Sequence, residues 1–166
     1  MSNRYRSAAW AIALLLFSAL PLAAQDPKPN LALTGGLGNV LGGLGTALEF
    51  YLAESRISAS GGLGYWPSGA GCSQGTFSGA GALRGFAGGR RHRAFLELSY
   101  SLLAISCDLF IEEDIERHYG PGVSLGYRYT GMDGFTFTAG AGIGDVPGDF
   151  GTEALILLAL GYTWRR

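Results

Sequence analysis

A period-two alternation near the end of the chain constrains the fold more than any other feature. From residue 158 onward, large apolar side chains alternate with small or polar ones: Leu158, Leu160, Tyr162 and Trp164 on one face, and Ala159, Gly161, Thr163 and Arg165 on the other. Successive side chains of a β-strand point to opposite faces, so residues 153–166 are predicted to form a strand. Its wholly apolar face must lie against a protein core or against lipid.

Seven earlier segments show similar alternation and are separated by turn signals. Together with the last segment they make eight predicted strands: residues 30–40, 44–53, 56–66, 75–87, 94–105, 118–130, 135–144 and 153–166. In residues 94–105, Leu96, Leu98, Tyr100 and Leu102 form the apolar face. Most of the 28 glycines among 166 residues lie within such segments. Small side chains suit the interior of an eight-stranded barrel, which only just holds its contents.

The connections between these segments alternate in length. Residues 54–55, 88–93 and 131–134 make short connections, whereas residues 67–74, 106–117 and 145–152 make long ones. Outer-membrane barrels have short periplasmic turns, longer extracellular loops and an even number of strands. We therefore predict an all-β protein, an eight-stranded antiparallel up-and-down transmembrane β-barrel with both termini in the periplasm. The first connection, a brief turn at Gly42 and Gly43, is the exception to the alternation.

The start of the chain is typical of a secretory signal peptide. Arg4 and Arg6 precede an apolar run over residues 8–22, and small residues follow it at Ala23 and Ala24. We predict that residues 1–25 are removed on export and that residues 26–166 form the barrel domain. An uncleaved membrane anchor is the alternative, which the short apolar run disfavours.

The last strand resembles the C-terminal strand of bacterial outer-membrane β-barrel proteins, which ends on an aromatic residue, here Trp164. The pattern of the remaining chain resembles the small eight-stranded members of that class, OmpX-like proteins and the membrane domain of OmpA-like proteins. The resemblance implies a location in the outer membrane of a Gram-negative bacterium and recognition by the barrel assembly machinery. It also implies contact with outer-membrane lipid and lipopolysaccharide, and a monomeric state.

Four charged residues fall on inward positions of the predicted strands: Glu49, Arg84, Glu97 and Arg128. Each lies a few residues from a predicted periplasmic turn, so the four are expected at similar depth. Charges of both signs in a confined interior pair with one another, because an isolated buried charge costs several kcal/mol. We interpret them as a structural charge cluster that fills the barrel. A selectivity filter or gate is the alternative interpretation.

Cys72 is predicted to lie in the third connection and Cys107 at the start of the fifth, so both are expected on the extracellular side, in loops two strands apart. Exported proteins with two cysteines favour a disulfide in an oxidising compartment. We predict a Cys72–Cys107 disulfide, and two unrelated thiols are the alternative.

Catalytic and metal-binding signals are sparse. His92 lies in a basic turn, and His118 lies near Ser106 and several acidic residues. Some lipid-modifying outer-membrane barrels pair a His with a Ser, but Gly120 stands where a His-x-Ser motif would place the serine. We predict no catalytic residue, no metal site and no cofactor. The acidic segment 108–116 is interpreted as a solvated loop, with a divalent cation site as the alternative.

The predicted function is that of a non-enzymatic integral outer-membrane protein, structural or surface-interacting through its long loops, with a filled interior. Without Arg4 and Arg6 the chain carries 10 basic residues against 13 acidic ones, a net charge of −3, which indicates no nucleic-acid partner. Two alternatives stay open: a lipid-modifying barrel enzyme using His118, and a soluble exported lipocalin-like barrel or β-sandwich with the apolar faces inward. A helical membrane protein, with small residues packing over 31–48, is a weaker one.

Overall fold

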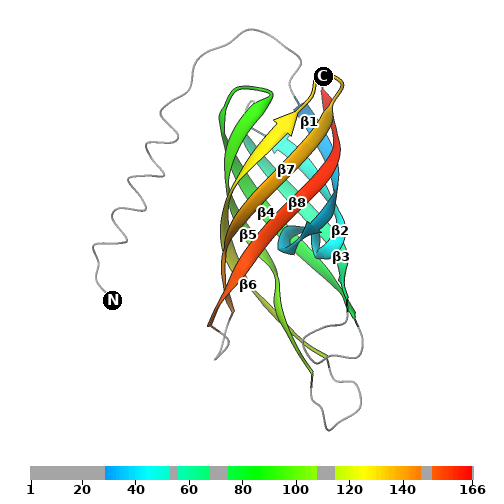
Figure 1. Cartoon of the computed structure of the whole chain (residues 1–166), viewed down its shortest axis with the longest axis vertical. Coiled ribbons are helices and arrows are strands. Elements are labelled where there is room, and N and C mark those ends of the chain that lie inside the picture. The colour runs from blue at the N-terminus through cyan, green and yellow to red at the C-terminus, as the bar shows by residue number, and fades with distance from the viewer. Residues whose placement is uncertain (1–28, 53–55, 68–74, 108–114, 147–150, 166) are drawn as a thin grey trace, which may run out of the picture.

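The protein forms a closed barrel of eight antiparallel strands in up-and-down order (Figure 1). The computed structural model describes residues 29–52, 56–67, 75–107, 115–146 and 151–165. The strands are β1 (Pro29–Gly38), β2 (Gly43–Leu52), β3 (Ile57–Trp66), β4 (Thr76–Gly88), β5 (His92–Cys107), β6 (Ile115–Thr130), β7 (Phe135–Val146) and β8 (Gly151–Arg165). Each strand pairs with the next, and β8 pairs with β1 to close the circle. The predicted eight strands and their order are confirmed.

Burial alternates along each strand as the sequence pattern predicts. In β8, Leu158, Leu160, Tyr162 and Trp164 are exposed on the outer face, while Leu157, Ala159 and Thr163 are buried inside. The end of the barrel that carries the short connections, called the turn end below, is at the top of Figure 1 together with the C-terminus. The opposite end, called the far end, is where the 16-residue strands β5 and β6 extend beyond the others.

The first connection differs from the turn that the sequence predicts. The alternation stops at Gly38, and residues Asn39–Leu41 form a 3-10 helix, η1, in which all three residues are buried. Gly42 follows in the left-handed conformation at φ 72°, which favours glycine. η1 contacts β4, β5 and β8 as well as its neighbours β1, β2 and β3. The connection therefore turns into the barrel and fills its interior, and the prediction that Val40 belongs to a strand is wrong.

Two further sequence predictions are corrected around β5. Leu102 was expected on the outer face but is fully buried: Ser101, Leu102 and Leu103 are buried in succession, next to a β-bulge between Leu102 and Ala104 that interrupts the alternation. The inserted Leu103 packs inside with Val146 and Leu155. The connection predicted over 106–117 is also shorter, since β5 and β6 stay paired as far as Ser106↔Glu116 and Cys107↔Ile115.

In the far half of the barrel wall, two pairs of neighbouring strands are not paired along their whole length. The β4–β5 ladder ends at Gly81↔Tyr100, and the β1–β8 ladder ends at Gly38↔Leu157. At the first of these gaps, the Arg117 Nε on β6 donates a hydrogen bond to Thr76 Oγ1 on β4 at 2.7 Å. Within the described part of the chain, no helix combines the length and the hydropathy of a membrane span.

Candidate functional site

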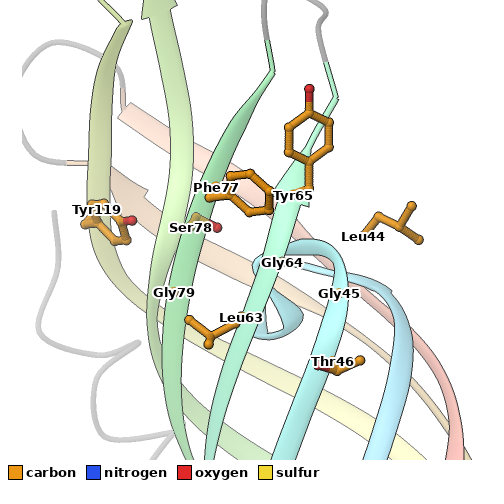
Figure 2. A pocket seen from close by; sticks show the side chains of 10 residues that line it. All are labelled: Leu44, Gly45, Thr46, Leu63, Gly64, Tyr65, Phe77, Ser78, Gly79 and Tyr119. Atoms are coloured by element: carbon orange, nitrogen blue, oxygen red, sulfur yellow. The ribbon is translucent and has the colours of Figure 1, made fainter.

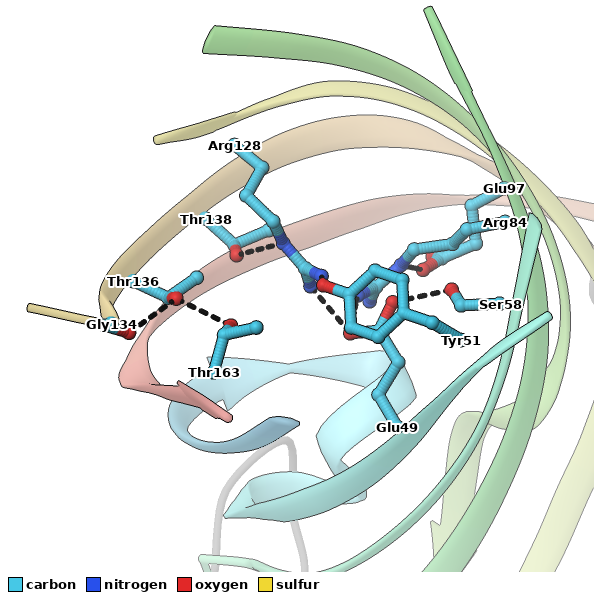
Figure 3. Close-up of polar contacts among 10 residues, drawn as sticks. All are labelled: Glu49, Tyr51, Ser58, Arg84, Glu97, Arg128, Gly134, Thr136, Thr138 and Thr163. Atoms are coloured by element: carbon cyan, nitrogen blue, oxygen red, sulfur yellow. Dashed lines mark hydrogen bonds and ion pairs between the residues drawn. The ribbon is translucent and has the colours of Figure 1, made fainter. Parts of the chain in front are cut away.

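The interior of the barrel holds a charge cluster of Glu49, Arg84, Glu97 and Arg128, contributed by β2, β4, β5 and β6 (Figure 3). The Arg84 Nη1 lies 3.2 Å from Glu49 Oε2, and the Arg84 Nε donates to Glu97 Oε2. The Arg128 Nη2 lies 2.6 Å from the same Glu49 oxygen. The structure thus brings together all four inward charges that the sequence singles out.

The register of the strands produces this meeting. Arg84 is directly opposite Glu97 across the β4–β5 ladder, so their side chains leave the wall side by side. Glu49 reaches both arginines across the lumen from β2, which is not adjacent to either strand. A barrel of eight strands is narrow enough for side chains to bridge its interior.

Neutral hydroxyl groups complete the cluster. Ser58 donates a hydrogen bond to Glu49 Oε1, and Arg128 donates to the hydroxyl of Tyr51 and, at 3.0 Å, to Thr138 Oγ1. No polar partner was assigned from the sequence to Tyr51, Ser58 or Thr138. Ser58 and Thr138 lie directly opposite Arg84 and Arg128 on neighbouring strands, and Tyr51 lies two residues from Glu49 on β2. Each therefore stands next to a charge that the sequence places inside the barrel.

An aromatic layer packs against the cluster. Phe86 and Phe95 are buried inside the barrel, and their ring centroids are 6.2 Å apart. The Arg84 guanidinium lies 5.1 Å from the Phe95 centroid, and the Arg128 guanidinium lies 5.2 Å from that of Phe86. Cation–π attraction therefore adds to the ion pairs.

The cluster is balanced in charge and removed from solvent. Its exposed fractions are 1 % for Glu49, 3 % for Arg84 and 0 % for both Glu97 and Arg128. Burying four charges costs several kcal/mol per ion, which is offset only when each charge finds a partner in good geometry. Two arginines with two glutamates satisfy that condition. The same four side chains also fill the lumen at this depth.

The outer face of the barrel is apolar on every strand. Exposed leucine, isoleucine, valine or aromatic side chains occur on each strand, from Leu33 and Leu37 on β1 to Trp164 on β8. Aromatic contacts mark both ends: Tyr162 with Trp164 near the turn end, and Tyr65 with Phe77 near the far end, each pair with centroids 5.2 Å apart. We call this surface the apolar belt.

A shallow hollow of about 510 Å³ lies in the apolar belt over β2, β3 and β4 (Figure 2). Leu44, Leu63, Tyr65 and Phe77 rise around it, and Tyr119 of β6 lies at its edge. Gly45, Gly64 and Gly79, one on each of these strands, also line it.

A second polar group lies near the far end, between β5 and β6. The Ser106 Oγ lies 2.8 Å from the Nε2 of His118, diagonally across the ladder. The Glu116 Oε2 lies 3.4 Å from Ser106 Oγ and 3.8 Å from the same His118 nitrogen. A serine next to a histidine is the arrangement of an activated nucleophile. Glu116, however, approaches the nitrogen that faces the serine, whereas the carboxylate of a catalytic triad holds the other ring nitrogen.

The remaining predicted residues fall elsewhere. His92 begins β5 at the turn end, where its exposed ring contacts the Tyr127 hydroxyl. Cys107 is the last residue of β5, not part of a connection as predicted, and Cys72 lies outside the described residues, so the disulfide stays a prediction. Among the residues that the structure describes, no group of three His, Cys, Asp or Glu side chains is placed to hold a metal ion.

Sequence reasoning overlooked Arg93, which it placed in the basic turn. Arg93 is the second residue of β5, is 8 % exposed, and lies over the Phe86 ring with its guanidinium 5.5 Å from the centroid. The inward position of Arg93 could have been predicted, because Arg93, Phe95 and Glu97 share one face of a strand.

Comparisons with protein-family models, curated proteins and solved structures find no match to this chain. The site is therefore interpreted from its own geometry.

Proposed function

We propose that the protein is a non-enzymatic integral outer-membrane β-barrel protein with a filled, non-conducting interior and a structural or surface-interaction role. One observation carries the proposal: the exposed apolar belt encircles the barrel, while its interior holds four paired charges. A soluble lipocalin-like barrel would have the opposite arrangement, apolar inside and polar outside. Large exposed apolar surfaces mark contact with lipid or with another protein, and a belt on all eight strands suits lipid.

The same proposal includes the location, the orientation and the partners. The turn end faces the periplasm, and the far end faces the outside of the cell. The belt contacts outer-membrane lipid and, at the far end, lipopolysaccharide, and the assembly machinery inserts the chain. Most residues of the long connections, 67–74, 106–117 and 145–152, lie outside the described residues, so their surface role stays a prediction.

The decisive experiment replaces a belt leucine by arginine. The variant is Leu125→Arg, because Leu125 is 59 % exposed and lies near the middle of the belt. Asp133→Arg at the turn end is the matched control. At the middle of a bilayer an arginine costs about 2–4 kcal/mol, whereas a soluble protein tolerates it on its surface. We expect Leu125→Arg to reduce the fraction that runs as a folded, heat-modifiable band in outer-membrane fractions.

A periplasmic, soluble protein without heat-modifiability would contradict the proposal. So would a Leu125→Arg variant that folds as well as Asp133→Arg, because the belt would then face water.

One contact favours a second candidate, a lipid-modifying enzyme that uses Ser106 as nucleophile and His118 as base. Their 2.8 Å separation supports it, and the position of Glu116 weakens it. Outer-membrane lipids would be compared by mass spectrometry in cells expressing the protein, Ser106→Ala, His118→Ala or the exposed control His92→Ala. A lipid change lost in both site variants and kept in the control would establish the enzyme, and unchanged lipids throughout would remove it.

A further inference from the structure

A pocket of about 240 Å³ opens at the turn end of the barrel and meets the charge cluster deeper inside at Tyr51. Four arginines line it: Arg90 and Arg91 from the β4–β5 connection, Arg93 from β5 and Arg165 from β8. None of its described lining residues is acidic. The hydroxyl-bearing side chains of Tyr51 and Thr163 also line it. We call this site the arginine mouth.

Several contacts hold the arginine mouth in shape. The Arg165 Nη2 donates a hydrogen bond to the Gly131 carbonyl at 2.7 Å, which ties the end of β8 to the β6–β7 turn. The Thr130 N–H donates to the Arg91 carbonyl at 2.8 Å, which fixes the backbone that carries Arg91. The buried Arg93 lies over the Phe86 ring. The site is thus a concave surface built on strand ends, with its positive groups already gathered.

The arginine mouth differs in composition from the charge cluster deeper inside the barrel. That cluster is balanced, with two arginines and two glutamates. At this end the described carboxylate of Asp133 is exposed and accepts a hydrogen bond from the Phe135 N–H at 3.2 Å. With four arginines and no acidic side chain among its described lining residues, the arginine mouth concentrates positive charge in a partly enclosed space, which strengthens its field.

We propose that the arginine mouth binds an anion that carries a phosphate or pyrophosphate group. Guanidinium groups match phosphate oxygens in a two-point geometry, and hydrogen bonds between charged groups are the strong ones. The Tyr51 and Thr163 side chains add hydroxyls beside the arginines. The pocket opens toward the solution at the turn end. Its lumen-facing lining comes from residues close to strand ends there: Tyr51, Arg93, Thr163 and Arg165. The phosphate belongs either to a soluble anion or to the headgroup of an anionic lipid in the adjacent leaflet.

The test uses the folded full barrel in zwitterionic detergent at low salt. Inorganic pyrophosphate is titrated by calorimetry in one arm. In the other arm, native mass spectrometry measures retention of phosphatidylglycerol against phosphatidylcholine from mixed micelles. The site variant is Arg91→Gln with Arg165→Gln. The control, Arg56→Gln, removes one charge from an exposed arginine at the same end but outside the pocket. Heat-modifiability confirms that each variant is folded, and Arg91→Gln alone replaces the double variant if that fails to fold.

We expect saturable binding that weakens at least about tenfold in the site variant, the equivalent of about 1.4 kcal/mol from lost charge-assisted hydrogen bonds, and that is kept in Arg56→Gln. Such binding of pyrophosphate alone assigns a soluble anion, and selective retention of phosphatidylglycerol alone assigns a lipid headgroup. Absence of both, or equal weakening by Arg56→Gln, overturns the proposal, because the effect would then come from diffuse charge.

Discussion

At the scale of single residues, Glu49 is the carboxylate on which the interior depends. It contacts Ser58, Arg84 and Arg128, which lie on three different strands. A buried ion pair gains little over an apolar replacement of the whole group, but removing one partner leaves uncompensated charges in a medium of low polarity.

Glu49→Gln is expected to lower the free energy of unfolding by about 3–5 kcal/mol, because two buried guanidinium groups lose their shared counter-charge. Urea unfolding of the barrel in micelles measures the change. Ser60→Ala is the matched control, since Ser60 lies directly opposite Glu49 across the β2–β3 ladder and its hydroxyl has no hydrogen-bond partner among the described residues. Equal unfolding midpoints for Glu49→Gln and the wild type would contradict the structural role of the cluster.

Glycines matter individually where they leave room for the aromatic layer. At Gly126 a Cβ atom would lie 2.2 Å from Phe95 Cζ and 2.5 Å from the Ala139 carbonyl oxygen. The backbone oxygen belongs to the neighbouring strand, so it cannot move away without disturbing the ladder. Gly61, in contrast, has nothing within 4 Å of the same position.

Gly126→Ala is therefore expected to destabilise the barrel by about 1–3 kcal/mol through overpacking. Gly61→Ala, on a strand but exposed, is expected to be neutral or to stabilise by about 0.4–1 kcal/mol. The same unfolding assay compares the two. If both substitutions have the same effect, the close packing of Phe95 against β6 is not what Gly126 serves.

At the scale of elements, η1 completes the far half of the wall. The Asn39 Nδ2 donates to the Leu102 carbonyl at 3.3 Å, and the Ile156 N–H donates to Asn39 Oδ1 at 3.4 Å. Leu102 lies beyond the end of the β4–β5 ladder, and Ile156 lies beyond the end of the β1–β8 ladder. Ser78 of β4 donates to the Gly42 carbonyl at 3.0 Å. One short helix thus supplies partners where strand pairing stops.

Asn39→Ala is expected to cost about 1–3 kcal/mol, because the buried Leu102 carbonyl loses its partner and the part-buried Ile156 N–H loses one as well. Hydrogen exchange at Ile156 reports the local loss, and urea unfolding reports the global one. Asn30→Ala is the control, as Asn30 is exposed at the other end of β1. Unchanged protection of Ile156 would show that η1 does not hold β8.

At the scale of the whole molecule, the barrel separates two surfaces of opposite character. Its lumen holds the charge cluster and η1, and its outside carries the apolar belt. The turn end gathers Arg56, Arg90, Arg91, Arg93 and Arg165. In the proposed orientation this basic end faces the periplasm, and the far end faces outward.

Cysteine labelling tests that orientation. In a background with Cys72→Ser and Cys107→Ser, a membrane-impermeant maleimide is expected to label Thr152→Cys at the far end in intact cells, but not Asp133→Cys at the turn end. Both positions are exposed in the folded barrel, so both are expected to react once the outer membrane is permeabilised. Labelling of Asp133→Cys alone in intact cells would reverse the orientation.

Much of the fold could be predicted because successive side chains of a β-strand point to opposite faces, which gives the sequence a period of two. The alternation in residues 158–164 and in 94–101 placed each side chain on the correct face, and turn signals separated the strands. Inward charges stood out because charges are rare on such faces, so Glu49, Arg84, Glu97 and Arg128 could be named as one group. Arg93 was open to the same reasoning.

The sequence by itself thus determined the strands, their faces and the depth of the inward charges, since these depend on residues near in the chain. The tertiary structure alone decided that Asn39–Leu41 enters the lumen, that Leu102 is buried beside a bulge, and that four arginines converge on one pocket. Each of these depends on contacts between segments far apart in the chain. Local periodicity carries no information about such contacts, because they exist only once the barrel has closed.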